Sequence, residues 1–415
     1  MERYNISGLV SSSRENTSYL TNFLSVSYIN DKLYNNMPGG EDHFDQTYGV
    51  YSKKGNVLIL PLSKYLAAVS DVTVSATVFT YGGTFRLREE ESKFDSEEEE
   101  LLETRLHDSK LNFPSAATAL ASALTEFCDS GVIGVDLSDM TRESISVLAK
   151  NEKYPIKNAI ELFRFVRMCK SEEEICRLRK AAEINEQVLK IVFEACMPGV
   201  RETDLESLCM SSIAKLGGEC RKGDFMAMFG SRSGTTSPPT QAMLKKEKMF
   251  WVDFNCRYRG YYADTGESGF LGVADEKQNK YYNAVKQTVD DVIDAIQPGV
   301  RPSELNKIAD TVWEKHGISS SGSGMGHGIG LEVHEYPRIS AAKGEASKNN
   351  QAIKDDFLAC STDIPLETSM VLNIEAPYLI WGWGGAHLEK TIVVHNDGAE
   401  LLVNQERQLR SIRMQ

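Results

Sequence analysis

The sequence predicts an α+β protein with two domains, on the basis of three observations. The first ~165 residues read as an α/β domain, a strongly helical segment follows them, and the octapeptide at 198–205 returns in altered form at 298–305. With 415 residues the chain is long enough for two or three domains and a large core. We expect one domain at residues 1–168 and another at residues 169–415.

The N-terminal half alternates strand-like and helical patterns. Strand-like runs are expected at Ile6–Ser11, Tyr48–Tyr51, Val57–Leu62, Val72–Tyr81 and Val132–Asp136. Helical patterns lie near Ser115–Cys128 and Arg142–Lys150. This half of the sequence has no cluster of histidines and acids. We therefore do not expect it to carry the chemistry alone.

The C-terminal half begins with a helix and contains an internal repeat. Ser171 is a good N-cap, and Glu174 completes a capping box, so a helix is expected from Ser171 to Cys196. PGVRETDL at 198–205 is echoed by PGVRPSEL at 298–305, and each copy follows one amphipathic helix and opens another. We interpret the repeat as a duplicated α+β unit whose two copies face each other across a cleft.

Composition narrows the class of protein. The net charge of −13 argues against nucleic acid or an anionic membrane as the main partner. Much of the acid lies in Glu89–Glu103, a run typical of a solvated surface. The eight cysteines form no close pair of the kind that binds zinc, and no run of 18 apolar residues suggests a membrane span. We expect a cytoplasmic protein with reduced thiols.

Five residues of the C-terminal half have the chemistry of metal ligands: Asp253, Asp264, His327, Glu375 and Glu389. Each lies in an apolar or glycine-flanked segment, and a buried carboxylate is expensive unless it is paired or binds a metal. Four carboxylates and one imidazole suit two divalent ions, because a carboxylate can bridge two ions and an imidazole can complete one. We predict two-metal hydrolysis with ions ~3.5–4 Å apart. Oxygen-rich sites accept Mn, Co, Fe or Zn.

The ligand-bearing segments are expected to be strands or strand edges: Met249–Asn255, Tyr258–Asp264, Glu332–Val333, Met370–Glu375 and His387–Val394. A turn expected at Cys256–Gly260 would fold the first two segments into a hairpin. The hairpin would bring Asp253 and Asp264 to one point.

Four motifs together resemble the pita-bread metallopeptidase family, which includes methionine aminopeptidase, aminopeptidase P and prolidase. They are VDFNCRYRGYYADTGES, GHGIGLEVHEYP, MVLNIEAP and GAHLEKTIVV, and the resemblance covers about residues 170–403. It implies a C-terminal pita-bread (creatinase/aminopeptidase) fold, preceded by a smaller creatinase-like α/β domain that the first half resembles only in outline. It also implies a homodimer, with the N-terminal domain shaping access to the cleft.

The resemblance implies a role for each ligand. Asp253 would hold one metal ion, while Asp264 and Glu389 would bridge both. His327 and Glu375 would hold the second ion. Glu375 would also act as the base for the bridging water.

His334, seven residues after His327, would then face the cleft and stabilise charge on the scissile carbonyl oxygen. The chain departs from the family pattern at two places. Thr236 or Ser237 stands where these peptidases usually have a further histidine, and His387 stands where proline-directed members tend to have an arginine. The metal chemistry therefore looks intact, while the residues that handle the substrate differ.

We expect a metallohydrolase that resembles Xaa-Pro aminopeptidase or prolidase and cleaves an amide bond of a small peptide or peptide-like substrate. The alternative is a non-peptidase enzyme on the same scaffold, a lyase or a C–N hydrolase of a small nitrogenous or sulfonium metabolite. His387, Trp381 and Trp383 are the candidate substrate-binding residues. A surface position for His387 and simple packing for the two tryptophans stay open.

Overall fold

The computed structural model describes residues 4–24, 46–71, 73–83, 96–319, 324–339, 363–403, 407 and 409–412. The chain divides into two compact units, the first ending at Phe163 and the second beginning at Arg164. The expected domains 1–168 and 169–415 remain a prediction. No helix in the described ranges is long and apolar enough to cross a membrane.

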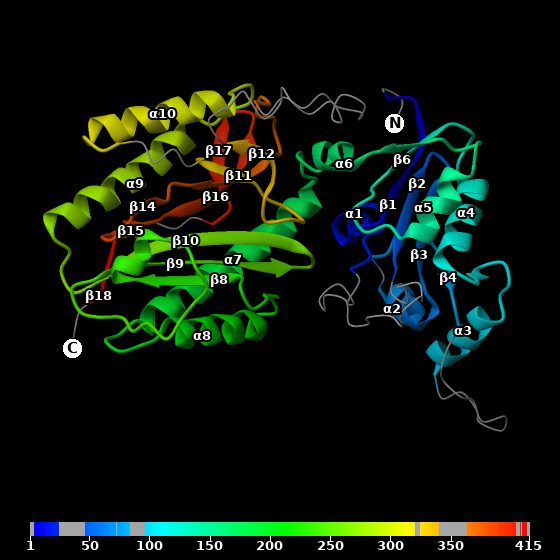
Figure 1. Cartoon of the computed structure of the whole chain (residues 1–415), viewed down its shortest axis with the longest axis horizontal. Coiled ribbons are helices and arrows are strands. Elements are labelled where there is room, and N and C mark those ends of the chain that lie inside the picture. The colour runs from blue at the N-terminus through cyan, green and yellow to red at the C-terminus, as the bar shows by residue number, and fades with distance from the viewer. Residues whose placement is uncertain are drawn as a thin grey trace. The chain divides into compact units, whose positions relative to one another are not determined.

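The described strands of the first unit form one mixed sheet in the order β5-β4-β3-β2-β1-β6-β7 (Figure 1). Its strands are β1 (Ile6–Ser11), β2 (Tyr48–Ser52), β3 (Gly55–Pro61), β4 (Thr77–Tyr81), β5 (Asn112–Phe113), β6 (Val132–Val135) and β7 (Ile156–Asn158). The helices are α1 (Arg14–Thr21), α2 (Tyr65–Ser70), α3 (Glu97–Leu106), α4 (Ala116–Phe127), α5 (Arg142–Ala149) and α6 (Ile160–Val166), with a 3-10 turn η3 at Leu62–Lys64.

Helices cover both faces of this sheet, because its central strands bury alternate side chains on opposite sides. In β3, Val57 and Ile59 join a core with α4 and α5. Leu58 and Leu60 of the same strand join the opposite core with α2 and α3. The expected α/β domain is therefore present. β4 begins later than expected, because the Asp71 carboxylate accepts hydrogen bonds from the N–H and hydroxyl of Thr73 and turns the chain there. Val72 itself lies outside the described residues.

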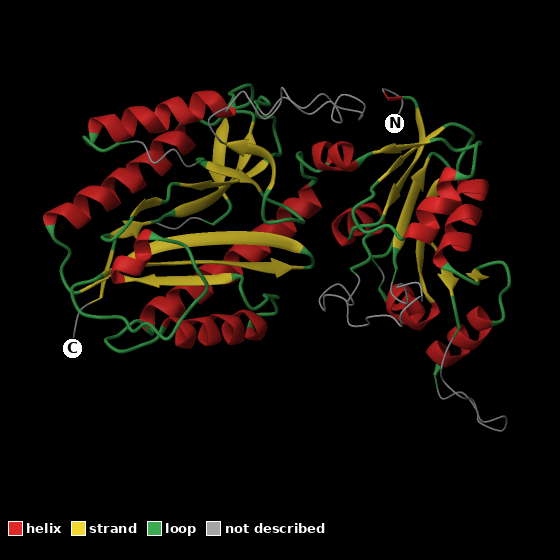
Figure 2. Cartoon of the chain, viewed as in Figure 1, coloured by secondary structure: helices red, strands yellow, loops and turns green. Residues whose placement is uncertain are grey.

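The second unit has sheets between two pairs of helices (Figures 1 and 2). The helices are α7 (Glu172–Glu194), α8 (Glu202–Lys215), α9 (Glu276–Asp294) and α10 (Pro302–Lys315). One sheet has the order β18-β10-β9-β8 and the other β12-β11-β13-β16-β17. Their strands are β8 (Phe225–Phe229), β9 (Met249–Tyr258), β10 (Tyr261–Leu271), β11 (Gly326–Gly328), β12 (Glu335–Ile339), β13 (Val371–Glu375), β16 (Glu389–His395), β17 (Gly398–Leu401) and β18 (Arg410–Ile412). A hairpin of β14 (Tyr378–Ile380) and β15 (Gly384–Ala386) and a 3-10 turn η4 (Gly230–Gly234) complete it.

The two copies of the sequence repeat occupy matching settings. Gly199 has φ +89° and donates its N–H to the carbonyl of Leu244 at 2.9 Å, while Gly299 has φ +93° and donates to Leu366 at 2.8 Å. Each glycine follows a long helix and precedes a helix whose start is closed by a capping box. A positive φ is the conformation that favours glycine, which explains why both copies keep it. The duplication inferred from the sequence is confirmed.

The duplication continues into the strands. β9 pairs with β8 and β10, and β13 pairs in the same antiparallel manner with β11 and β16. Counted from the first residue of its strand, Asp253 in β9 has the position of Glu375 in β13. Trp251 pairs with Met228 in the first copy, and the matching Asn373 pairs with His327 in the second. The second copy thus has a histidine, His327 on β11, where the first copy has a methionine, Met228 on β8.

Two local expectations needed correction. The turn between β9 and β10 is confined to Arg259 and Gly260, with φ of 49° and 86°, because two consecutive positive-φ residues match the twist of a tight hairpin. It does not begin at Cys256, which still lies in β9. Glu332–Val333 is a bend between β11 and β12 instead of a strand.

Candidate metal centre

The five residues predicted as ligands come from five strands of the second unit, two in one sheet and three in the other. Asp253 lies opposite Gly266, and Asp264, two residues from Gly266, therefore points to the same face of the β9–β10 pair. Glu375 and Glu389 lie directly opposite each other on β13 and β16. Neighbouring strands thus present two pairs of carboxylates.

Two histidines link the carboxylates. His327 Nε2 lies 3.8 Å from Asp264 Oδ2 and 3.8 Å from Glu375 Oε1, so it connects the two sheets. His387 Nε2 lies 2.7 Å from Glu389 Oε1 and 3.6 Å from Asp253 Oδ2. The structure thus brings together all five predicted ligands and also His387, which the sequence suggested as a contact to substrate.

Burial and mutual repulsion dominate the electrostatics. Burial, reinforced by the charge of Glu389, raises the pKa of Glu375 to about 8 and that of Asp253 to about 6. The same two causes hold the pKa of Asp264 well above its usual range. Burial would also raise the pKa of Glu389, but the adjacent His387 lowers it instead. The raised pKa values show that the positive charge near these carboxylates does not balance their negative charge.

The fit to a divalent cation follows from the donor set. Carboxylate oxygens and neutral imidazole are ligands for Mn, Co, Fe and Zn. Asp264 Oδ1 is buried and has no hydrogen-bond partner among the described residues. A buried carboxylate oxygen without a partner is costly, and a metal ion would satisfy it. Asp264, His327 and His334 offer ligand atoms that lie within 4.8 Å of one another, as do Asp253, His387 and Glu389.

His327 and His334 each have an identifiable tautomer. His327 Nδ1 lies 3.0 Å from the carbonyl of Gly328, so Nδ1 carries the proton and Nε2 faces the acids. Burial, with the nearby His334, lowers the pKa of His327 to about 4. The ring centroids of His327 and His334 are 4.0 Å apart. Arg338 Nη2 lies 3.1 Å from His334 Nδ1; arginine can only donate, so neutral His334 carries its proton on Nε2.

Three residues near the predicted metal ligands were not identified from the sequence. The first, Arg338, lies four residues after His334 in the HEYPR stretch and was open to detection. Asn373 donates to Glu389 Oε2 at 3.1 Å, and Thr391 donates to Asn373 Oδ1 at 3.0 Å. Such contacts orient a ligand carboxylate. The only sequence signal for Asn373 was an amide within the apolar run MVLNIE.

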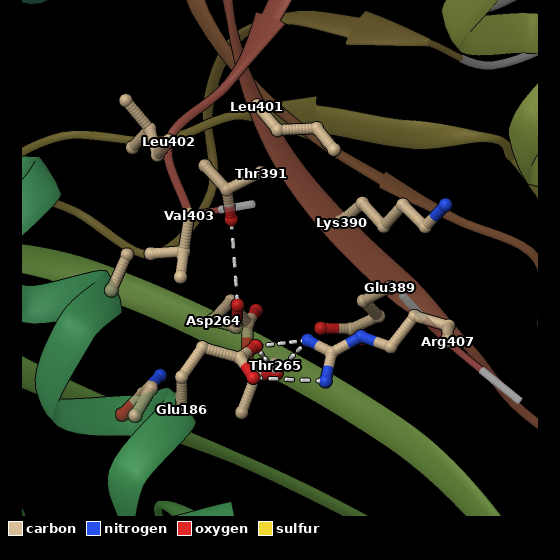
Figure 3. A pocket seen from close by; sticks show the side chains of 12 residues that line it. Glu186, Asp264, Thr265, Glu389, Lys390, Thr391, Leu401, Leu402, Val403 and Arg407 are labelled. Atoms are coloured by element: carbon tan, nitrogen blue, oxygen red, sulfur yellow. Dashed lines mark hydrogen bonds and ion pairs between the residues drawn. The ribbon is translucent and has the colours of Figure 1, made fainter. Parts of the chain in front are cut away.

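A small pocket is lined by residues of α7, β10 and β16, two of which are predicted ligands (Figure 3). Asp264 and Glu389 both line it, together with Glu186 of α7 and Arg407. Arg407 Nη1 donates to Glu186 Oε2 at 3.0 Å, and its Nη2 donates to the hydroxyl of Thr265 at 3.1 Å. The ion pair is buried on both sides. No local pattern could have indicated it, because its partners come from opposite ends of the second unit.

The remaining candidates lie elsewhere. The Trp383 ring centroid is 5.0 Å from that of Tyr281 on α9, and Lys277 Nζ is 4.8 Å above the Trp383 ring. Trp381 is 85% exposed. Ser237, at the place of the absent family histidine, accepts a hydrogen bond from Arg232 at 2.8 Å. The assignment of Trp381 and Trp383 to substrate binding remains a prediction.

Comparison with known proteins agrees with the geometry. The profile of metallopeptidase family M24 matches residues 176–396, more than half of the chain. The Xaa-Pro dipeptidase of Pyrococcus horikoshii is 26% identical over 255 residues, which is 61% of this chain and 67% of that protein. An uncharacterized peptidase of Staphylococcus aureus is 27% identical over 249 residues, 58% of this chain and 64% of the relative.

Solved structures extend the likeness to the whole fold. The prolidase of Pyrococcus horikoshii OT3 superposes with a TM-score of 0.73 at 21% identity, covering 99% of this chain and 97% of that one. The Xaa-Pro dipeptidase of Bacillus anthracis gives 0.73 at 19% identity, covering 99% and 96%. The predicted α+β class, with an N-terminal α/β domain and a C-terminal pita-bread domain, is confirmed. With its profile match, its fold and its cluster of acids and histidines, this chain belongs to metallopeptidase family M24.

Proposed function

We propose that this M24 metallopeptidase is a dinuclear metal-dependent hydrolase that cleaves an amide bond in a small peptide or peptide-like substrate, in the manner of Xaa-Pro dipeptidases and aminopeptidases. The observation that carries the proposal is the convergence of Asp253, Asp264, His327, Glu375 and Glu389 on one point, with a buried Asp264 oxygen that lacks a partner. These five residues would hold the metal ions. Bound divalent ions supply Lewis-acid polarisation of a carbonyl and an activated water.

Glu375 is the best-placed base among the acids. The exposed fractions of the four carboxylate side chains are 2% for Glu389, 8% for Asp264, 17% for Asp253 and 23% for Glu375. The most exposed carboxylate is the one that a substrate entering from solvent can approach. Glu375 would take the proton of the attacking water and pass it to the leaving nitrogen.

His334 and Arg338 would orient the substrate. With its Nδ1 accepting from Arg338, His334 presents an Nε2–H donor beside His327. A fixed donor stabilises the negative charge that develops on a scissile carbonyl oxygen. Arg338 is exposed and carries a permanent charge, so it is available to a substrate carboxylate. It offers a substitute for the arginine that His387 replaces.

The substrate choice is expected to depart from that of standard proline peptidases. Neither Thr236 nor Ser237 can supply a charged imidazolium near neutral pH. Trp381 and Trp383 remain candidates for contacts with the substrate. These departures keep the alternative open: a lyase, or a C–N hydrolase of a small nitrogenous or sulfonium metabolite, on the same scaffold.

We further propose a homodimeric, cytoplasmic enzyme that uses manganese or a similar divalent ion, with domains 1–168 and 169–415. Light scattering of the purified chain at micromolar concentration tests the dimer, since a monomer would contradict it.

The decisive experiment is a substrate panel on reconstituted enzyme. Metal-free protein receives Mn²⁺, Co²⁺, Fe²⁺ or Zn²⁺ and is assayed on Xaa-Pro dipeptides and longer Xaa-Pro peptides. We expect metal-dependent hydrolysis, lost in Asp253→Asn and retained in His395→Gln, whose exposed side chain pairs with Glu400 away from the ligands. Enzyme with two bound ions that cleaves no amide bond in the panel would reject the peptidase proposal and favour the alternative.

A further inference from the structure

His387 was predicted from the sequence to contact the substrate, but its side chain is buried beside two of the predicted metal ligands. Its side chain is 4% exposed, and its Nε2 points between Asp253 and Glu389, away from solvent. We propose that His387 Nε2 is a direct ligand of the ion held by Asp253 and Glu389, so that each ion of the centre has one imidazole. This inference rests on the metal centre of the proposed function and adds a sixth protein ligand to it.

The distances from His387 Nε2 to the two carboxylates are close to those between atoms that share one ion. Ligands that bind a metal at ~2.0–2.2 Å lie about 2.8–3.6 Å from one another in tetrahedral or octahedral arrangements. His387 Nε2 lies 2.7 Å from Glu389 Oε1 and 3.6 Å from Asp253 Oδ2. His327, the predicted ligand of the other ion, lies 3.8 Å from each of its two carboxylates. Each of the two histidines thus directs its Nε2 at a pair of carboxylates, and His387 lies nearer to its pair.

β10 is shaped to hold this imidazole. Gly266 faces it, and a Cβ at that position would lie only 2.5 Å from His387 Nε2, so the ring fits because residue 266 has no side chain. Ser268, two residues on and fully buried, accepts the His387 N–H and donates to the His387 carbonyl, both at 2.8 Å. Trp251 packs edge-on against the ring with centroids 5.5 Å apart. These contacts fix both the backbone and the ring plane.

The duplicated architecture leaves room for this assignment. Met228 in the first copy has the strand position of His327 in the second copy. The ion nearer Asp253 therefore receives no imidazole from its own copy. His387, which precedes β16 of the second copy, places a nitrogen at that ion's acids. With His387 as a ligand, each of the two ions would have one imidazole.

The alternative is a hydrogen bond from His387 to the two carboxylates with no bond to the ion. With Nε2 bound to an ion, Nδ1 must carry the proton, and Nδ1 is buried without a partner among the described residues. Only direct coordination transmits the unpaired spin of a paramagnetic ion strongly to that proton. Proton NMR of the Co²⁺-loaded enzyme therefore distinguishes the two, because a coordinated imidazole gives a strongly shifted, exchangeable N–H signal.

The experiment loads the full-length protein with two equivalents of Co²⁺ and compares wild type with His387→Gln, His327→Gln and His395→Gln. We expect wild type to show shifted N–H signals of which one is lost in His387→Gln and a different one in His327→Gln. His395→Gln, a matched control on β16, should keep them all. If no shifted signal of wild type is lost in His387→Gln, the proposal is overturned.

A second measurement covers the case in which His387→Gln fails to fold or to bind cobalt. A crystal structure of the wild-type, metal-loaded enzyme should place His387 Nε2 at ~2.0–2.1 Å from an ion. A separation beyond 3 Å in that structure would overturn the proposal. Neither readout involves turnover. Two coordinated histidines in an enzyme that hydrolyses no peptide would support this inference while rejecting the peptidase function, and the reverse result would do the opposite.

Discussion

A methyl group at position 266 tests how tightly the centre is packed around His387. Gly266 is buried in β10 at a backbone φ that any residue can adopt, so Gly266→Ala changes the space and not the backbone conformation. The new Cβ would lie 2.5 Å from His387 Nε2 and 3.0 Å from Glu389 Cγ. Because carbon atoms prefer separations of ~3.5–4.0 Å, the imidazole must move by about 1 Å.

The expected cost comes from two opposing effects. Overpacking of a buried site costs about 1–3 kcal/mol. Replacing glycine by alanine also removes freedom from the unfolded chain, which contributes ~0.4–1 kcal/mol in the other direction. We expect Gly266→Ala to lower the free energy of unfolding of the metal-free second unit by about 1–2 kcal/mol. Displacement of His387 should also weaken Co²⁺ binding.

The assay is urea unfolding of metal-free protein followed by tryptophan fluorescence. All four tryptophans, Trp251, Trp313, Trp381 and Trp383, lie in the second unit, so the signal reports on that unit. A double-mutant cycle with His387→Ala isolates the contact. Once the imidazole is removed, Gly266→Ala should cost less than about 0.5 kcal/mol.

Gly269→Ala on the same strand is the matched control. Its Cβ would lie 2.8 Å from a ring atom of Phe193 and still closer to one of Phe250, so it should also destabilise the fold, but His387→Ala should not relieve it. The reasoning is refuted if Gly266→Ala is neutral, or if its cost is unchanged when His387 is alanine. Either result would mean that the new methyl group is accommodated without displacing the His387 imidazole.

Three further predictions concern the same unit. In metal-free protein, burial and Glu389 raise the pKa of Glu375 from 4.5 to about 8, so the folded state keeps a proton that the unfolded state releases. The free energy of unfolding should fall as pH rises through that window, and urea titrations of Glu375→Gln should show a flatter dependence. Glu335→Gln removes the buried carboxylate that pairs with both Lys170 and Arg167, and leaves Arg167 only its contact with the more exposed Glu332. It should cost about 3–5 kcal/mol in urea unfolding, whereas Glu332→Gln, at a side chain 42% exposed, should cost under about 1. Asp264→Asn should abolish high-affinity Mn²⁺ binding in calorimetry, and retention of two tight sites would contradict the assignment of a bridging ligand.

The sequence by itself determined the elements with strong local signals. Ser171 and Glu174 form the predicted capping box, and the helix behind them ends at Glu194, close to the expected stop. The repeated glycines at 199 and 299 occupy matching turns with positive φ. Because glycine is favoured at such positions, the repeat could be seen in the sequence. The four carboxylates among the five predicted ligands could be singled out because an acid within an apolar run is costly to bury unless it is paired or binds a metal.

The surroundings of these predicted ligands were decided by the tertiary structure alone. Nothing local indicates that Arg407 pairs with Glu186, or that Gly266 leaves room for His387, since each contact joins segments more than 100 residues apart. Such contacts depend on strand register and on the meeting of the two sheets at β10 and β16. A side chain's burial and its partners are properties of the assembled sheets. Local sequence patterns record which residues can serve as ligands, whereas packing between distant strands decides what surrounds each of them.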